Sequence, residues 1–136
     1  MEGTRPYPGI LSVLETLNAE GYRLAVVSNK IDSAVKELTV HFFGRRIPVA
    51  IGERANVARK PAPDSVYAAL NELGMAKESA AYVGDSEVDL ATARNAGLPC
   101  FSVDWGNRTD EQLLAAGATS ISRTAAELLE KIRSAE

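Results

Sequence analysis

The sequence lacks three features that would mark specialised classes of protein. It has a single cysteine, Cys100, which has no partner for an intramolecular disulfide and fits a reducing compartment, so we expect a cytoplasmic protein. It has no apolar run close to the roughly 20 residues of a membrane-spanning helix, so we expect no membrane association. Fifteen lysines and arginines stand against 18 aspartates and glutamates, and the net charge of −3 argues against a dedicated nucleic-acid-binding protein.

What the sequence does contain is the composition of one folded domain. Its 136 residues are 46% hydrophobic and 24% charged, which excludes a disordered or low-complexity chain. A chain of this length buries about two thirds of the surface that its unfolded form exposes, so it needs no disulfide or zinc ion to fold. We find no linker, internal repeat or second domain, and we treat residues 1–136 as a single domain.

Hydrophobic periodicity predicts alternating helices and strands. Short apolar runs indicate buried strands, and apolar residues at helical spacing, several of them ending at a glycine, indicate the helices between them. The expected strands are 24–27, 47–51, 80–83 and 100–103, and the expected helices lie around 10–17, 32–42, 66–73, 88–96, 113–114 and 124–132. This alternation predicts an α/β fold, a three-layer Rossmann-like parallel sheet with helices on both faces.

Local signals refine three of these elements. Asp32 is a candidate cap for the helix that follows it. Thr124 and Glu127 match the S/T-x-x-E capping box, which predicts the start of the last helix. Pro48 cannot donate a hydrogen bond to a neighbouring strand, so its strand belongs at the edge of a sheet.

Polar residues gather where the expected strands end. Ligands of parallel sheets bind outside the carboxyl ends of the strands, so the residues just beyond each strand are candidates for function. These candidates are Ser28-Asn29-Lys30, Glu53, Gly84-Asp85-Ser86 and Asp104, with Arg59-Lys60-Pro61 in a segment before a helix. The set suits an anion held by Ser28 and Lys60 beside a hard metal ion held by Asp85.

Each candidate also has a purely structural interpretation. Ser28 and Asn29 alone are typical of a turn and a helix cap, and Lys60 alone of a solvated loop. Asp85 fits a cap as well as it fits a functional carboxylate. Asp89 lies four residues on, on the same helix face, and carboxylates at that spacing repel by about a few tenths of a kcal/mol unless a cation lies between them. That repulsion favours a metal ion.

Three segments, taken in order, resemble the motifs of the haloacid dehalogenase-like (HAD) phosphatase superfamily, and within it the phosphoglycolate phosphatase group. Residues 24–30 (LAVVSNK) look like the second family motif, a strand ending in Ser or Thr. Residues 59–64 (RKPAPD) are similar to the third, which supplies a lysine. Residues 82–89 (YVGDSEVD) resemble the fourth, an acidic metal site written G-D-S-x-x-D. The resemblance extends from about residue 6 to residue 103.

The resemblance implies a role for each matching residue, and a cofactor. Ser28 would hydrogen-bond the transferring phosphoryl group of a small phosphorylated metabolite, with Asn29 supporting it through the loop. Lys60 would be the catalytic residue that neutralises phosphate charge and orients the nucleophile. Asp85 would bind Mg²⁺, and Asp89 would hold that metal site. Phosphoryl transfer depends on positioning and charge neutralisation, so such a set is the expected one.

The family's first motif, D-x-D-G-T, does not occur in the sequence. In the family its first aspartate attacks phosphorus and its second acts as acid and base, on a strand between those that end here at Ser28 and Gly84. Without it, these two strands must pair directly, leave a gap, or accept a strand from another chain. We therefore expect a partial HAD core, a C-terminal fragment that is inactive alone and is completed by strand exchange in a dimer or by a missing N-terminal half.

Other functions stay open at this point. A noncatalytic HAD-fold module that binds a partner or a metabolite is the alternative from another class. Within the superfamily the alternatives are a pyrophosphatase and a phosphosugar phosphatase or mutase, because the family's cap domain, which selects the substrate, is absent. A dehalogenase is disfavoured because an acidic Mg²⁺ site has no role when the leaving group is a halide.

Overall fold

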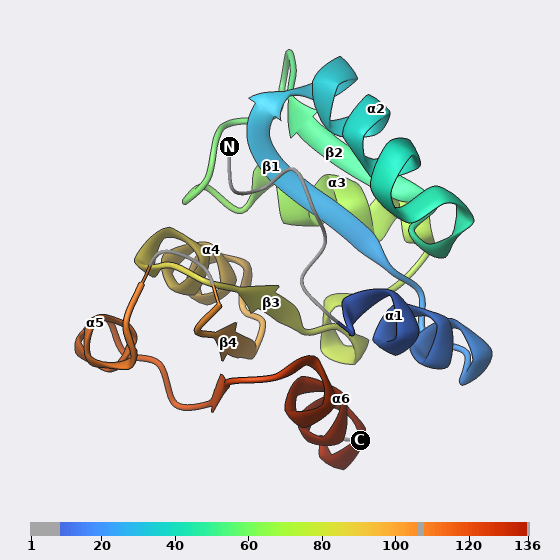
Figure 1. Ribbon diagram of the computed structural model, residues 1–136. Coiled ribbons are helices and arrows are strands. Elements are labelled where there is room, and N and C mark those ends of the chain that lie inside the picture. Colours follow the sequence, from blue (N-terminus) through green and yellow to red (C-terminus); the bar gives the residue numbers. More distant parts are fainter. Residues whose placement is uncertain (1–8, 106–107, 136) are drawn as a thin grey trace.

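The computed structural model describes residues 9–105 and 108–135, which form alternating helices and strands (Figure 1). The strands are β1 (Ala25–Ile31), β2 (Val49–Glu53), β3 (Tyr82–Gly84), β4 (Cys100–Val103) and β5 (Ile121–Ser122). The α-helices are α1 (Ile10–Ala19), α2 (Asp32–Phe43), α3 (Asp64–Leu73), α4 (Glu87–Ala96), α5 (Asp110–Ala115) and α6 (Ala125–Ser134), with 3-10 turns η2 (Gly44–Arg46) and η3 (Lys77–Ser79). The expected α/β class is confirmed, and β5 is an element that the sequence patterns missed.

The described strands form two parallel sheets. β1 pairs with β2 in one sheet, and β3, β4 and β5 form the other in that order. Among the described residues, β1 and β3 therefore each pair with a strand on one side only. Direct pairing of these two strands, one of the three arrangements that the sequence left open, is wrong. β2 lies at an edge, as each strand of a two-stranded sheet does, but it spans Val49–Glu53, so the expected strand 47–51 begins two residues too early and Pro48 precedes the strand.

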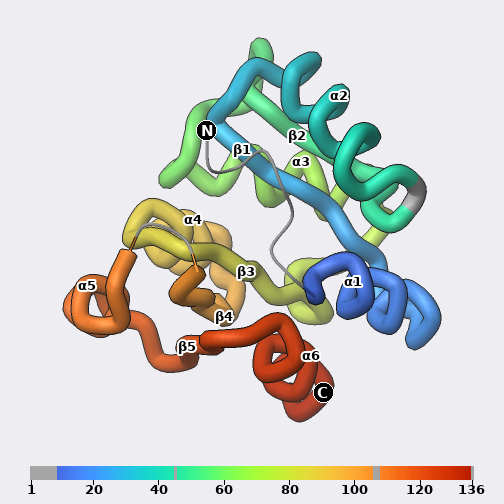
Figure 2. Tube along the Cα trace, in the orientation of Figure 1, coloured from blue at the N-terminus to red at the C-terminus, as the bar shows by residue number. Residues whose placement is uncertain are grey.

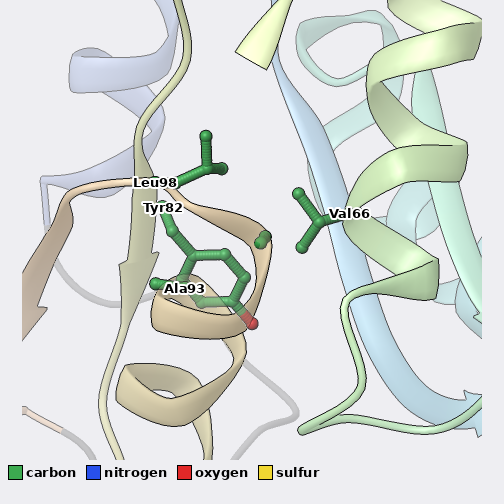
Figure 3. Close-up of a cluster of buried hydrophobic side chains, with 5 residues drawn as sticks. Val66, Tyr82, Ala93 and Leu98 are labelled. Atoms are coloured by element: carbon green, nitrogen blue, oxygen red, sulfur yellow. The ribbon is translucent and has the colours of Figure 1, made fainter. Parts of the chain in front are cut away.

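Helix packing joins the two sheets. α3 contacts β1 and β2 on one side and α4 on the other, and α1 lies beside α6 (Figure 2). One buried cluster also joins the two halves of the chain, the first from α1 to α3 and the second from β3 to α6. In this cluster Val66 of α3 faces Tyr82 and Ala93 of the second half (Figure 3). Val27 of β1 packs against the same cluster. Apolar contacts therefore hold the halves together where no strand pairing does.

β1 is longer than the apolar run that predicted it. The expected strand ended at Val27, but β1 continues through Ser28 and Asn29 to Ile31, with a shift in its register against β2 between Val27 and Ile31. Ser28 and Asn29 are therefore strand residues. The turn and helix cap that these residue types favour in isolation are not what they form.

The local signals at the helix starts have mixed outcomes. Asp32 is the first residue of α2, and its carboxylate accepts hydrogen bonds from the Gly52 N–H (2.9 Å) and the Lys36 ammonium (2.7 Å), so the expected cap is wrong. Thr124 does cap α6, because its hydroxyl accepts from the Glu127 N–H at 3.1 Å. The Glu127 carboxylate bonds the N–H of Arg123, one residue before the partner that a capping box requires.

The glycines expected at the ends of α3 and α4 have the predicted conformation. Gly74 and Gly97 have φ angles of 70° and 79°, in the left-handed region that glycine reaches without strain. Within the described part of the chain, no helix combines the length and the apolar character needed to cross a membrane.

Candidate active site

Asp89, in the first turn of α4, is the centre of a hydrogen-bond network. Its Oδ1 accepts hydrogen bonds from the Lys60 ammonium (2.8 Å) and the Tyr82 hydroxyl (2.7 Å). Its Oδ2 accepts from the backbone N–H of Asp85 (3.0 Å) and the hydroxyl of Ser86 (3.1 Å). The side chain is only 9% exposed. The carboxylate therefore uses both oxygens to orient protein groups around it.

The local sequence explains why Asp89 reaches this position. Ser86 is the N-cap of α4, and its hydroxyl accepts from the Asp89 N–H at 3.3 Å, so the cap is Ser86 rather than Asp85. Gly84 provides the space, because a Cβ at Gly84 would lie 2.3 Å from the Cβ of Asp89. The Gly-Asp-Ser segment thus turns the chain from β3 into α4 with Asp89 packed directly against the strand end.

Lys60 is held at both ends. It lies in the connection between β2 and α3, and its side chain is 15% exposed. Besides Asp89, its ammonium donates to the Tyr82 hydroxyl at 3.2 Å. Its backbone N–H and C=O bond the side-chain amide of Asn29 at 2.7 and 3.2 Å. The solvated loop lysine is therefore the wrong interpretation, and Lys60 is a largely buried cation.

Ser28 precedes Asn29 in β1. Its Oγ accepts a hydrogen bond from the Lys30 N–H at 3.2 Å, which orients the oxygen. An accepting hydroxyl keeps its own proton for donation to another group. Because Asn29 contacts Lys60, Ser28 belongs to the strand end that lies against the Lys60 segment.

The network shifts the pKa values of three of its members. Burial opposes the ionisation of Asp89, but the charge and hydrogen bond of Lys60 and the hydrogen bond of Tyr82 outweigh it and lower the pKa of Asp89. Burial, and then the charge of Asp89, raises the pKa of Asp85. The same two causes raise the pKa of Tyr82 far above its usual range, so its hydroxyl stays a donor.

Asp85 is the carboxylate of the network that fits a divalent cation. It is half-buried, and the like charge of Asp89 disfavours its ionised form, an effect that an adjacent cation would reverse. Mg²⁺ is commonly bound by one or two carboxylates, with water and phosphate oxygens completing its shell. Among the described residues no group of three or more His, Cys, Asp and Glu side chains is arranged to hold a metal ion.

Two other candidates from the ends of the expected strands form ion pairs outside this network. Glu53 lies 4.0 Å from Arg59, and Asp104 lies 3.8 Å from Arg123, in ion pairs separate from the Asp89 network. The structure thus brings together Asn29, Lys60, Asp85 and Asp89, with Ser28 next in the chain. Whether Asp89 takes part in a metal site stays a prediction, because its contacts are with Lys60, Tyr82, Ser86 and the Asp85 backbone.

Tyr82 is a member of the site whose role the sequence did not predict, and Arg108 forms an ion pair with Glu87, which is near Asp85 in the sequence. Tyr82 was interpreted only as a strand residue, although a hydroxyl on a buried strand needs a polar partner and that need was a signal. Arg108 forms two hydrogen bonds with Glu87 (2.7 and 3.1 Å), and these lower the pKa of Glu87 to about 2. The bonds to Glu87, and to a lesser extent the charge of Asp85, raise the pKa of Arg108.

This geometry agrees with a family match. Lys60 is paired to Asp89, and Asp89 also orients the loop that carries Asp85. The model of the haloacid dehalogenase-like hydrolase family matches residues 2–103, and the chain belongs to that family. Within it the chain falls in the phosphoglycolate phosphatase-like group of phosphatases, as its relatives show.

Two curated relatives and one solved structure define this relationship. The chain is 34% identical over 123 residues to a phosphoglycolate phosphatase of Rhodospirillum rubrum, covering 89% of this chain and 50% of that protein. It is 32% identical over 130 residues to the pyrophosphatase PpaX of Halalkalibacterium halodurans, covering 92% and 59%. The crystal structure of a proposed phosphoglycolate phosphatase from Lactobacillus delbrueckii subsp. bulgaricus matches with a TM-score of 0.92 at 41% identity, covering 94% and 54%. The chain spans about half the length of the curated phosphoglycolate phosphatases that it matches.

Proposed function

We propose that this chain supplies most of the active site of a Mg²⁺-dependent phosphomonoester hydrolase, similar to phosphoglycolate phosphatases, that acts on a small phosphorylated metabolite. The observation that carries the proposal is the largely buried Lys60 ammonium, bonded to Asp89 at 2.8 Å, with the Asp85 backbone bonded to the same carboxylate. A fixed cation beside a half-buried carboxylate suits a phosphoryl group and a metal ion bound side by side. The phosphatases among the relatives support the same class of reaction.

In this mechanism Ser28 and Lys60 bind the phosphoryl group. The Ser28 hydroxyl donates to one phosphoryl oxygen, and the Lys60 ammonium neutralises negative charge that develops on the others. Asp85, with Asp89 behind it, would hold Mg²⁺, which supplies further charge neutralisation when it is bound. Asp89 keeps both the Lys60 ammonium and the Asp85 loop in place, so little reorganisation is needed when the substrate arrives.

The nucleophile must come from a segment outside the three motifs. The 136-residue sequence has no D-x-D-G-T motif, and the carboxylates of the site already have other roles in the proposal. We propose that an extended segment carrying this motif, from an N-terminal half, completes the sheet between β1 and β3. Strand exchange between two copies of this chain could fill the same gap, but it would not bring the motif, because the sequence lacks it. In the described part of the chain β1 and β3 each pair on one side only, which supports this proposal, because an open strand edge is a template for a further strand.

Phosphate binding tests the site. Inorganic phosphate is titrated into the ¹⁵N-labelled chain with Mg²⁺ present, and we expect saturable shifts of the Ser28 and Lys60 amide signals. Lys60→Met should weaken the binding that produces these shifts about tenfold or more, because a hydrogen bond from a charged group is lost. Lys77→Met, at an exposed lysine in η3, should leave the binding unchanged. Shifts that are absent, or equally strong in Lys60→Met, contradict the proposal.

Turnover tests the need for a separate nucleophile. The pure chain should not hydrolyse para-nitrophenyl phosphate above the level of its Lys60→Met variant. Adding a polypeptide that carries the D-x-D-G-T strand and its cap domain should produce Mg²⁺-dependent turnover. Hydrolysis by the pure chain that disappears in Lys60→Met would show that the chain already holds a nucleophile.

A noncatalytic HAD-fold binding module is the second candidate, favoured by the absent D-x-D-G-T motif. It predicts phosphate binding with no turnover after the strand is added. The similarity to a pyrophosphatase keeps that activity open as well. Assays of the completed protein with phosphoglycolate, pyrophosphate and a phosphosugar, the last also monitored for mutase product, separate these substrate classes.

A further inference from the structure

The side-chain amide of Asn29 in β1 bonds both backbone polar groups of Lys60, which lies in the connection between β2 and α3. Asn29 Oδ1 accepts the N–H of Lys60 at 2.7 Å, and Asn29 Nδ2 donates to the C=O of the same residue at 3.2 Å. The two residues lie 31 positions apart in the sequence. One side chain therefore satisfies both backbone polar groups of Lys60, which lies outside any helix or strand.

The contact with Asn29 fixes the backbone of Lys60, whereas other residues fix its ammonium. The ammonium is bound by Asp89 and Tyr82 of the second half of the molecule, whereas Asn29 belongs to β1 of the first. Lysine has a flexible four-carbon side chain, so its ammonium has a defined position only when both ends are held. Asn29 and Asp89 together provide those two points.

The backbone carbonyl of the next residue, Pro61, is bonded as well. Asn95 of α4 donates from Nδ2 to the C=O of Pro61 at 2.8 Å. The Lys60-Pro61 segment is thus bonded to β1 on one side and to α4 on the other. Because the described strands β1 and β3 do not pair, this segment is a polar link between the two sheets at the candidate site.

We propose that Asn29 is a positioning residue for Lys60: it sets the location of the ammonium by holding the backbone N–H and C=O of Lys60, and it acts on a bound anion through Lys60 rather than by touching the anion. The role differs from support of Ser28 through the strand end, which the sequence resemblance implied. The part that concerns a bound anion rests on the proposed function, whereas the positioning of the lysine does not.

Amine labelling tests the positioning by itself. The chain is treated with a limiting amount of acetic anhydride, and acetylation at each lysine is followed by peptide mass spectrometry. In Asn29→Ala we expect Lys60 to label about fivefold faster relative to Lys77, the factor that follows from losing roughly 1 kcal/mol of hydrogen bonding. An unchanged Lys60 rate overturns the proposal.

A matched control separates this effect from general loosening of the fold. Asn18 makes a comparable long-range bond, from Nδ2 to the C=O of Arg46 at 2.9 Å, away from the site. Asn18→Ala should leave the Lys60 rate unchanged, and an equal rise in both variants contradicts a specific role. If Asn29→Ala does not fold, the isosteric Asn29→Asp, which keeps the acceptor for the Lys60 N–H and loses the donor, should show a smaller rise; no rise there overturns the proposal.

A double-mutant cycle tests how Asn29 acts on an anion. Asn29→Ala should weaken the binding of inorganic phosphate about fivefold in the native background and not at all in Lys60→Met. Equal losses in both backgrounds mean that Asn29 touches the phosphate directly and overturn the proposal. If no variant binds phosphate, the proposed function fails, and the labelling result alone decides the positioning role.

Discussion

The Lys60 ammonium and the Asp89 carboxylate form an ion pair at 2.8 Å whose side chains are only 15% and 9% exposed. The two charged side chains come from different parts of the chain, because Lys60 lies in the connection after β2 and Asp89 lies in α4. Each charge left buried without the other would be costly, because the protein interior solvates ions poorly. The pair therefore links the stability of the chain to the integrity of its candidate site.

Removing one charge of this pair should be strongly destabilising. Asp89→Asn leaves the Lys60 ammonium largely buried without its counter-charge, and we expect the free energy of unfolding to fall by about 3 kcal/mol. Urea titration measures it. The double variant Asp89→Asn/Lys60→Met should recover part of the loss, because it leaves no unpaired charge. Glu15→Gln, which breaks the exposed pair with Arg46, should cost less than about 1 kcal/mol. Similar costs for Glu15→Gln and Asp89→Asn would contradict this account.

Gly84→Ala should displace Asp89 from the strand end. The new Cβ would lie 2.3 Å from Asp89 Cβ and 2.4 Å from its Cγ, so β3 or α4 must shift, at a cost of about 1–3 kcal/mol. Phosphate affinity should fall with it, because Asp89 orients Lys60. Gly74→Ala is the comparator: its Cβ would meet nothing within 4 Å, and only its φ of 70° is unfavourable. It should lose stability, measured by urea titration, and keep phosphate affinity, measured by calorimetry.

Mg²⁺ should stabilise the chain through Asp85. A ligand that binds only the folded state adds about 2.7 kcal/mol to the free energy of unfolding at 100 times its dissociation constant. We expect a Mg²⁺-dependent rise in the melting temperature that disappears in Asp85→Asn. Glu53→Gln, at an exposed carboxylate on the other sheet, should keep it. A rise of the same size in Asp85→Asn would place the bound metal somewhere other than Asp85.

Local patterns predicted the elements of this fold better than its contacts. Gly74 and Gly97 end helices because of a conformational preference that belongs to glycine itself, so the sequence suffices. Asn29 has no such preference for Lys60: their pairing depends on β1 extending past its apolar run and on the path of a segment 31 residues away. Tyr82 likewise was predicted in a strand, but the partner of its hydroxyl depends on how α4 packs against that strand. The order of the motifs predicted that Lys60, Asp85 and Asp89 lie close together. The hydrogen bonds among them could be identified only from the structure.

Asp32 should make the stability of the chain depend on pH. The hydrogen bond from Lys36, and then that from the Gly52 N–H, lower the pKa of Asp32 below its usual value of about 3.9. A carboxylate with a lowered pKa in the folded state stabilises the fold above its unfolded pKa, and this stabilisation is lost as the pH falls through the folded value.

The matching experiment compares native chain, Asp32→Asn and Lys36→Met by urea titration from about pH 7 to about pH 2.5, a range that spans the usual carboxyl pKa. Asp32→Asn should be less stable than the native chain at neutral pH, with the two curves converging in acid as the native carboxylate is protonated. Lys36→Met removes the principal cause of the shift, so its curve should lie between them and fall less steeply than that of the native chain. Native and Asp32→Asn curves that stay parallel down to the acid end would mean that the contacts of Asp32 with Lys36 and Gly52 do not favour its charged form.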